Sequence, residues 1–107
     1  MKDTKRKILD TARSLFNDFG FGNVTIRMIA LKLKMSSGNL NYHFKTREEI
    51  LEALYFEMVA DFDDRIARLG GQEITLQSMK EDISQSLQRM IDFRFIWTDL
   101  YNLLRLN

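Results

Sequence analysis

Apolar side chains recur at helical spacing along the whole chain, and nowhere do they alternate as in a half-buried strand. The first such stretch stops at Gly20, a residue type that is favoured just after a helix ends. A chain of 107 residues is long enough to bury a core between several helices. Helices are expected at about residues 4–19, 26–33, 37–43, 47–69, 75–91 and 93–106. The sequence therefore predicts an all-α fold.

Three hydroxyl residues stand where the second, third and fourth helices should begin. Thr25, Ser36 and Thr46 can each accept a hydrogen bond from a backbone N–H of the first turn, as N-cap residues do. Glu49 follows Thr46 at the spacing of a capping box. Only residues 34–36 separate the second helix from the third. Two short helices joined so tightly predict a helix-turn-helix, whose second helix enters the major groove of DNA.

The third predicted helix is poor in core-forming side chains. Leu40 and Phe44 are its expected core residues, together with Phe16 of the first helix. Asparagine amides can form two hydrogen bonds with adenine, and the free N–H groups at helix starts favour phosphate. Its outer face carries small polar residues: Ser36, Ser37, Gly38, Asn39 and Asn41. The residues expected beside the starts of the neighbouring helices are Thr25, Arg27, Lys45 and Thr46.

Charge is distributed unevenly along the chain. Residues 1–50 hold ten Lys and Arg against five Asp and Glu, whereas residues 51–107 hold six against ten. The net charges of the two parts are therefore +5 and −4, although the whole chain carries only +1. A basic first half favours a polyanionic partner. The alternative reading is an uneven surface charge that serves solubility.

Composition argues against an enzyme, a metalloprotein and a membrane protein. The chain has no cysteine and a single histidine, so thiolate or histidine metal sites are not expected, and His43 has no recognisable nucleophile to activate. No cofactor-binding motif is present. The N-terminus lacks the apolar core of a signal peptide, and no apolar run is long enough to span a membrane. We expect a cytoplasmic protein without metal, cofactor or catalytic residues.

The same residues resemble the DNA-binding domain of the TetR family of bacterial repressors. The upstream run from Ile8 to Gly20 is similar to the first helix of that family. Two positions depart from its pattern: Lys34 replaces the usual turn glycine, and Asn41 replaces a tyrosine that is found one place later, as Tyr42. The residues that match the family's motif are Thr25, Ile29, Ala30, Ser36, Gly38, Leu40, His43, Phe44, Glu48 and Glu49.

The resemblance implies a helix-turn-helix DNA-binding domain over residues 1–46. Residues 47–107 would then form a connecting helix and the beginning of a helical ligand-binding and dimerisation domain, which we expect to be incomplete. The implied partners are double-stranded DNA with a palindromic operator, a second copy of the chain and, in a full-length protein, a small-molecule inducer. The expected base contacts are Arg27, Ser37, Gly38, Asn39 and Asn41. The expected phosphate contacts are Lys5, Thr25, Ser36, Tyr42, His43, Lys45 and Thr46.

The sixth predicted helix has an unusually wide apolar face, with Phe95 and Leu106 expected to point away from it. A helix that is apolar nearly all round is normally buried on most sides. Trp97, Leu100 and Leu104 are therefore expected to meet a second subunit or further regulatory domain. The alternative function is a helical protein–protein interaction module that docks through this apolar helix. Salt dependence separates the two, because phosphate binding weakens steeply with salt and apolar docking does not.

Overall fold

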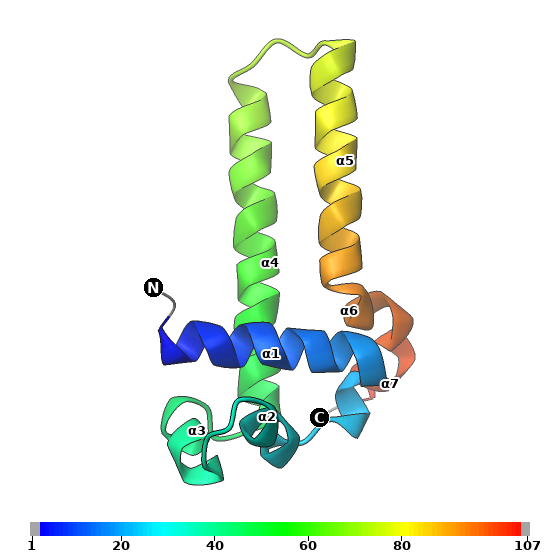
Figure 1. Ribbon diagram of the computed structural model, residues 1–107. Helices are drawn as coiled ribbons and strands as arrows, with labels where there is room; N and C mark the ends of the chain where they lie inside the picture. The colour runs from blue at the N-terminus through cyan, green and yellow to red at the C-terminus, as the bar shows by residue number, and fades with distance from the viewer. Residues whose placement is uncertain (1–2, 106–107) are drawn as a thin grey trace.

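The computed structural model describes residues 3–105, except the side chains of Leu100 and Tyr101. Every regular element of this described part is a helix (Figure 1). This confirms the all-α prediction. None of the described helices is long and apolar enough to cross a membrane. In chain order the elements are α1 Thr4–Phe19, the short 3-10 turn η1 Phe21–Asn23, α2 Ile26–Lys32, α3 Ser37–His43, α4 Arg47–Gly70, α5 Leu76–Asp92, α6 Arg94–Thr98 and α7 Leu100–Leu104.

Helix α1 lies across α4, with α2 and α3 gathered at one end of α4 (Figure 1). Its first turn is capped by Asp3, whose Oδ1 accepts a hydrogen bond from the N–H of Arg6 at 2.7 Å. It ends at Gly20, whose N–H donates to the carbonyl of Phe16 at 2.9 Å. The φ of Gly20 is +86°, a conformation that favours glycine over residues with a Cβ. The predicted bounds of this helix are therefore confirmed.

Phe16 of α1 sits at the centre of the buried core. Its ring centroid lies 5.0 Å from that of Phe21 and 5.3 Å from that of Phe95. Leu40 and Phe44 are also buried, so the three core residues expected for the DNA-binding unit are confirmed. The same buried cluster includes side chains of α4 and of the segment around α6. A domain boundary after residue 46 stays a prediction, but this core extends across that position.

The turn between α2 and α3 is closed by a Schellman motif. The N–H of Lys34 donates to the carbonyl of Leu31 at 3.1 Å, and the N–H of Met35 donates to the carbonyl of Ala30 at 3.0 Å. Lys34 itself has a φ of +57°. The position that resembles a family glycine thus keeps the left-handed conformation with a lysine, which costs an L-residue about 1–2 kcal/mol.

The end of the chain differs from the sequence prediction. The single helix expected at 93–106 is two short helices, α6 and α7, separated by a turn at Asp99. Phe95, which was expected to point away from the apolar face, is fully buried. Trp97 is 49% exposed, and Leu104 is 75% exposed. The expectations for the Leu100 side chain and for Leu106 lie outside what the structure describes.

Polar side chains explain why the chain bends there. The side chain of Asn17 donates to the carbonyl of Asp92 at 2.7 Å and accepts from the N–H of Phe95 at 3.0 Å. The carboxylate of Asp99 accepts from the N–H of Phe21 at 3.1 Å and from the Asn102 amide at 2.7 Å. Aspartate is a weak helix former whose side chain competes for backbone donors. These bonds hold α6 against the end of α1 and prevent one continuous helix.

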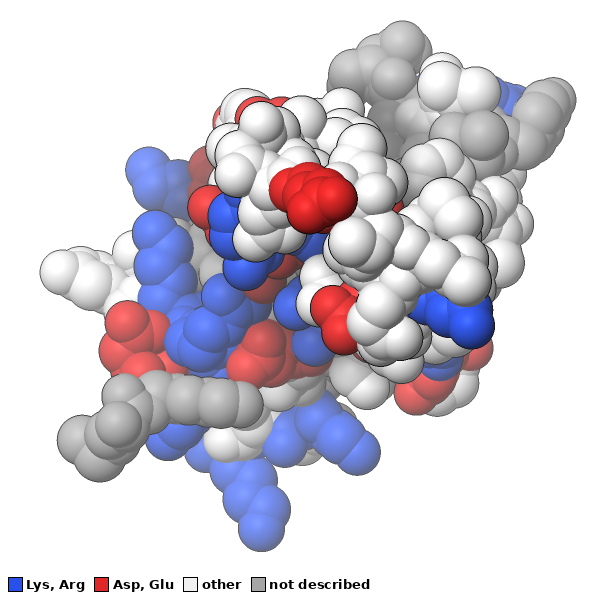
Figure 2. Space-filling view, turned by 90° about the horizontal axis from the view of Figure 1, so that it is seen from above, with Lys and Arg blue, Asp and Glu red and all other residues white. Residues whose placement is uncertain are grey.

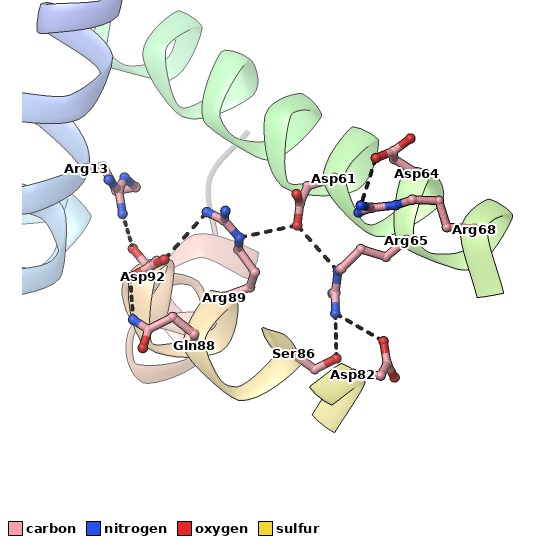
Figure 3. Close-up of polar contacts among 10 residues, drawn as sticks. All are labelled: Arg13, Asp61, Asp64, Arg65, Arg68, Asp82, Ser86, Gln88, Arg89 and Asp92. Atoms are coloured by element: carbon pink, nitrogen blue, oxygen red, sulfur yellow. Dashed lines mark hydrogen bonds and ion pairs between the residues drawn. The ribbon is translucent and has the colours of Figure 1, made fainter. Parts of the chain in front are cut away.

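Helices α4 and α5 stand side by side as a long pair (Figure 1) and are linked by charged side chains (Figure 3). Asp61 pairs with Arg65 at 3.5 Å and with Arg89 at 3.3 Å. The buried Arg65 also donates to the hydroxyl of Ser86 at 2.7 Å. Arg89 continues to Asp92 at 3.5 Å, next to α1. None of the residues of α5 is buried, so directional polar contacts rather than a dry core fix this pair.

Replacement of Lys34 by glycine should stabilise the protein. Glycine adopts a positive φ without strain, and after its extra chain entropy is allowed for we expect a gain of about 0.5–1 kcal/mol in the free energy of unfolding. The measurement is the urea midpoint. Lys7→Gly, within α1, is the control and should lose about 1 kcal/mol. A lower midpoint for Lys34→Gly would contradict the left-handed assignment.

Phe95→Ala should destabilise the fold far more than Trp97→Ala. Phe95 is fully buried against Phe16, and truncation of such a phenylalanine costs about 3–5 kcal/mol. Trp97 is close to it in the chain but half exposed, so its truncation should cost much less. Urea denaturation of both variants tests this. Equal losses would mean that α6 is not seated on α1.

Candidate nucleic-acid interface

The three predicted N-caps are present in the structure. Thr25 Oγ1 accepts from the N–H of Met28 at 3.2 Å, and Ser36 Oγ accepts from the N–H of Asn39 at 3.0 Å. Thr46 Oγ1 accepts from the N–H of Glu49 at 3.2 Å. All three hydroxyl residues are exposed, and each hydroxyl hydrogen can still be donated. These helix starts therefore expose donors suited to phosphate oxygens.

The capping box predicted for α4 is displaced by one residue. Glu49 does not return its side chain to the N–H of the cap; its Oε2 instead accepts from the N–H of Lys45 at 2.8 Å. The N–H of Lys45, in the loop just before the cap, is the donor within reach of this carboxylate. The bond fixes the backbone of Lys45 while its side chain stays exposed.

Helix α3 presents a polar, exposed face. Leu40 is its one buried residue. A Cβ built on Gly38 would meet no atom of the described chain within 4 Å, so internal packing does not require glycine there. Glycine lowers the stability of a helix by about 1 kcal/mol relative to alanine, so its presence here calls for a reason other than stability. The absence of a side chain would let a partner approach the backbone of α3 closely. The exposed residues of the face are Ser37, Gly38, Asn39, Asn41 and Tyr42.

Tyr42 and His43 lie at the end of α3 with different exposures. The Tyr42 side chain is 85% exposed, which is unusual for so large a ring, and His43 is half-buried. Their rings meet edge to face with centroids 5.2 Å apart. His43 also lines a surface hollow with Phe44 and Glu49. Tyr42 is thus free to contact a partner, whereas packing contributes to the position of His43.

Two neighbouring basic residues of α1 are used differently. Lys5 is exposed, with its Nζ 5.4 Å from the centroid of the Phe44 ring. Arg6 pairs with Glu57 of α4 at 2.9 Å and with Asp10 at 3.0 Å. Burial would lower the pKa of the Arg6 guanidinium, but hydrogen bonds and charges of Glu57 and Asp10 outweigh it and raise the pKa. Arg6 stays charged and joins α1 to α4, and Lys5 is available to a partner.

Arg27 is exposed on α2, on the same part of the molecule as α3. The sequence-predicted contacts thus come together from α2, α3 and the start of α4, with Lys5 beside them on α1. Arg47, which no sequence pattern singled out, is a different case. Its Nη1 donates to the backbone carbonyls of Phe21, Gly22 and Val24 at 3.0–3.3 Å. The sequence shows only a charged residue at the first position of α4, because these acceptors belong to a distant segment of the chain.

The end of the molecule away from α2 and α3, where α4 connects to α5, has a more apolar surface. Figure 2 looks down on the α4–α5 end, where uncharged residues cover much of the nearest surface, and Lys and Arg side chains are seen mainly toward the left and the lower edge of the view, with others at the right. Large apolar residues of α5 are about half exposed, among them Met79, Ile83 and Leu87. No group of three His, Cys, Asp or Glu that could hold a metal ion occurs among the described residues.

Comparison with known proteins agrees with this geometry. Residues 8–54 match the family described as bacterial regulatory proteins, tetR family. The HTH-type transcriptional repressor Rv1474c of Mycobacterium tuberculosis is 29% identical over 77 residues, which are 72% of this chain and 39% of that protein. The tetracycline repressor protein class D of Escherichia coli is 28% identical over 87 residues, 81% of this chain and 39% of that protein.

A solved structure shows the same arrangement of helices. The TetR-family transcriptional regulator from Marinobacter aquaeolei VT8 superposes with a TM-score of 0.88 at 33% identity, over 96% of this chain and 51% of that chain. The chain therefore spans about half, or less, of the length of these three proteins. The matched segment runs from α1 through the helix-turn-helix into α4. With its helix-turn-helix motif and this structural likeness, the segment at residues 8–54 belongs to the TetR family of bacterial regulatory proteins.

Proposed function

We propose that the chain is a sequence-specific DNA-binding transcriptional repressor. The observation that carries the proposal is helix α3: it buries Leu40 alone and turns its small polar residues to the outside. A short helix of this kind gains little from the core, but its size and hydrogen-bonding groups suit the major groove. The basic first half of the chain and the repressor names of two relatives support the same function.

In this proposal, the contacts divide into two classes. Arg27, Ser37, Gly38, Asn39 and Asn41 read base edges, because their side chains or backbone are exposed on α2 and α3. The phosphate class surrounds them at helix starts and on α1, and fixes the register of the protein on the duplex. Its members are Lys5, Thr25, Ser36, Tyr42, His43, Lys45 and Thr46.

The proposed repressor acts as a dimer on a palindromic operator. One helix-turn-helix reads only a few base pairs, so a second copy is needed for a specific site. The surface proposed for pairing, or for contact with further regulatory domain, is the C-terminal segment with Trp97, Leu100 and Leu104. Phe93, Phe95 and Ile96 are buried in the core, which leaves them unavailable for a docking surface and makes the alternative interaction module less attractive.

We also propose release by a small-molecule inducer. A groove of about 320 Å³ lies between α4, α5 and α6, and its apolar walls include Met58, Phe62, Met90 and Trp97. Asp61, Arg65 and Arg89 lie at the same groove. A ligand that separated α4 from α5 would break the ion pair between Asp61 of α4 and Arg89 of α5. Arg89 also pairs with Asp92, whose backbone carbonyl accepts a hydrogen bond from Arg13 of α1, so the disturbance would reach the helix on which the DNA-binding helices pack.

The function is tested by selection of bound duplexes from a random DNA library. The expected product is a palindromic consensus with half-sites about one helical turn apart, or a multiple of it. Asn39→Ala and Asn41→Ala should each relax the consensus at one base pair per half-site, because a bidentate amide discriminates by about 1–3 kcal/mol. Gln85→Ala, on α5, is the control and should select the parental consensus. If both asparagine variants do so too, α3 does not read bases.

Lys45→Ala should weaken binding to all DNA sequences about equally. Its exposed side chain stands beside the start of α4, where a phosphate contact would release one counterion. The slope of log affinity against log salt concentration should fall by about 1. Lys80→Ala, an exposed lysine of α5, is the matched control and should leave the slope unchanged. A loss limited to one consensus sequence would remove Lys45 from the phosphate class.

A further inference from the structure

Arg47 is the first residue of α4, and its side chain reaches back to the segment that leads into α2. Its Nη1 lies 3.3 Å from the carbonyl of Phe21, 3.1 Å from that of Gly22 and 3.0 Å from that of Val24. The guanidinium carbon lies 4.9 Å from the centroid of the Phe21 ring. Its Nε faces the carboxylate of Glu48 at 3.4 Å. The N–H groups of the guanidinium thus face backbone carbonyls and a carboxylate of the protein, and its planar face lies near the Phe21 ring.

The acceptors of Arg47 hold the entry into α2. Val24 directly precedes Thr25, the cap of α2, and Arg47 directly follows Thr46, the cap of α4. Phe21 is held from its other side by Asp99, whose carboxylate accepts from its N–H at 3.1 Å. One arginine therefore links two helix starts that are well separated in the sequence.

We propose that Arg47 is a positioning residue for DNA binding. It sets the place of Thr25 and Arg27 relative to Lys45 and Thr46, and it does not itself contact phosphate. The inference rests on the proposed function. Because the side-chain amino group Nη1 has two hydrogens for three carbonyls, at least one hydrogen is shared between two of them.

Lysine distinguishes this role from a phosphate contact. Its ammonium is a good point-charge partner for phosphate, so Arg47→Lys would preserve a phosphate contact. A compact ammonium on a flexible stem lacks the planar fork and cannot lie flat on the Phe21 ring while it meets the carbonyls. A positioning role therefore predicts that Arg47→Lys weakens binding although it retains the charge.

The experiment measures the affinity of parent, Arg47→Lys and Arg47→Ala for the duplex selected by the parent, at several salt concentrations. Both variants should bind about tenfold more weakly or worse, since hydrogen bonds from a charged donor are lost, with the salt slope of the parent. Lys45→Ala is the phosphate control and should lower the slope by about 1. Arg68→Ala removes an exposed arginine from the same helix and should behave as the parent.

Amide hydrogen exchange gives a second readout. In Arg47→Lys, the N–H groups of Met28 and Ile29, which bond to Thr25, should exchange faster, while those in the middle of α4 stay protected. A variant that merely lowered overall stability would lose protection in both places.

Each outcome decides between the roles. Suppose that Arg47→Lys binds DNA with the parental affinity and that Arg47→Ala lowers the slope of log affinity against log salt concentration by about 1. Arg47 would then be a phosphate contact, and the inference would be overturned. Parental affinity in both variants would also overturn it, as would an Arg47→Lys protein that does not fold, because the bonds would then support the whole fold rather than α2. A parent that selects no DNA refutes the proposed function and the inference with it.

Discussion

The buried ring of Phe16 organises the packing of the whole molecule. It meets Phe21, from the turn after its own helix, and Phe95, from the far end of the chain. Burial of one large apolar side chain is worth about 1.5–3 kcal/mol, and each favourable ring pair adds about 0.5–1.5 kcal/mol. Helix α1 thus packs against both the helix-turn-helix and α6.

Apolar burial is not directional, so it does not by itself decide where short helices begin. Side chains that bind backbone groups supply that information. Asn17 and Asp99 fix the segment around α6 on α1 and η1, and Arg47 fixes the entry into α2. Leu40 anchors α3 in the core, which leaves the outer residues of α3 free for DNA in the proposed function.

The α4–α5 pair follows a different principle. Its apolar residues are largely half exposed, and its arrangement relies on Asp61, Arg65 and Arg89. Exposed ion pairs contribute at most about 1 kcal/mol each, whereas removal of one partner from a buried charge such as Arg65 is costly. The two ends of the molecule therefore differ in construction: a dry core supports the DNA-binding helices, and a charged network supports the groove proposed for the inducer.

Local sequence was enough to specify most of the helices, their caps and the polar face of α3, because helical periodicity and N-cap chemistry act within a few residues of the chain. Contacts between distant segments settled the remainder. Phe95 points inward and the last helix breaks at Asp99, because their partners, Phe16 and Phe21, lie near the opposite end of the chain. The displaced capping box and the left-handed Lys34 are local features, fixed by the bond from the N–H of Lys45 to Glu49 and by the bonds from the N–H groups of Lys34 and Met35 to the end of α2. The role proposed for Arg47 could not be predicted from the sequence, because its three carbonyl acceptors come close to it only in the folded chain.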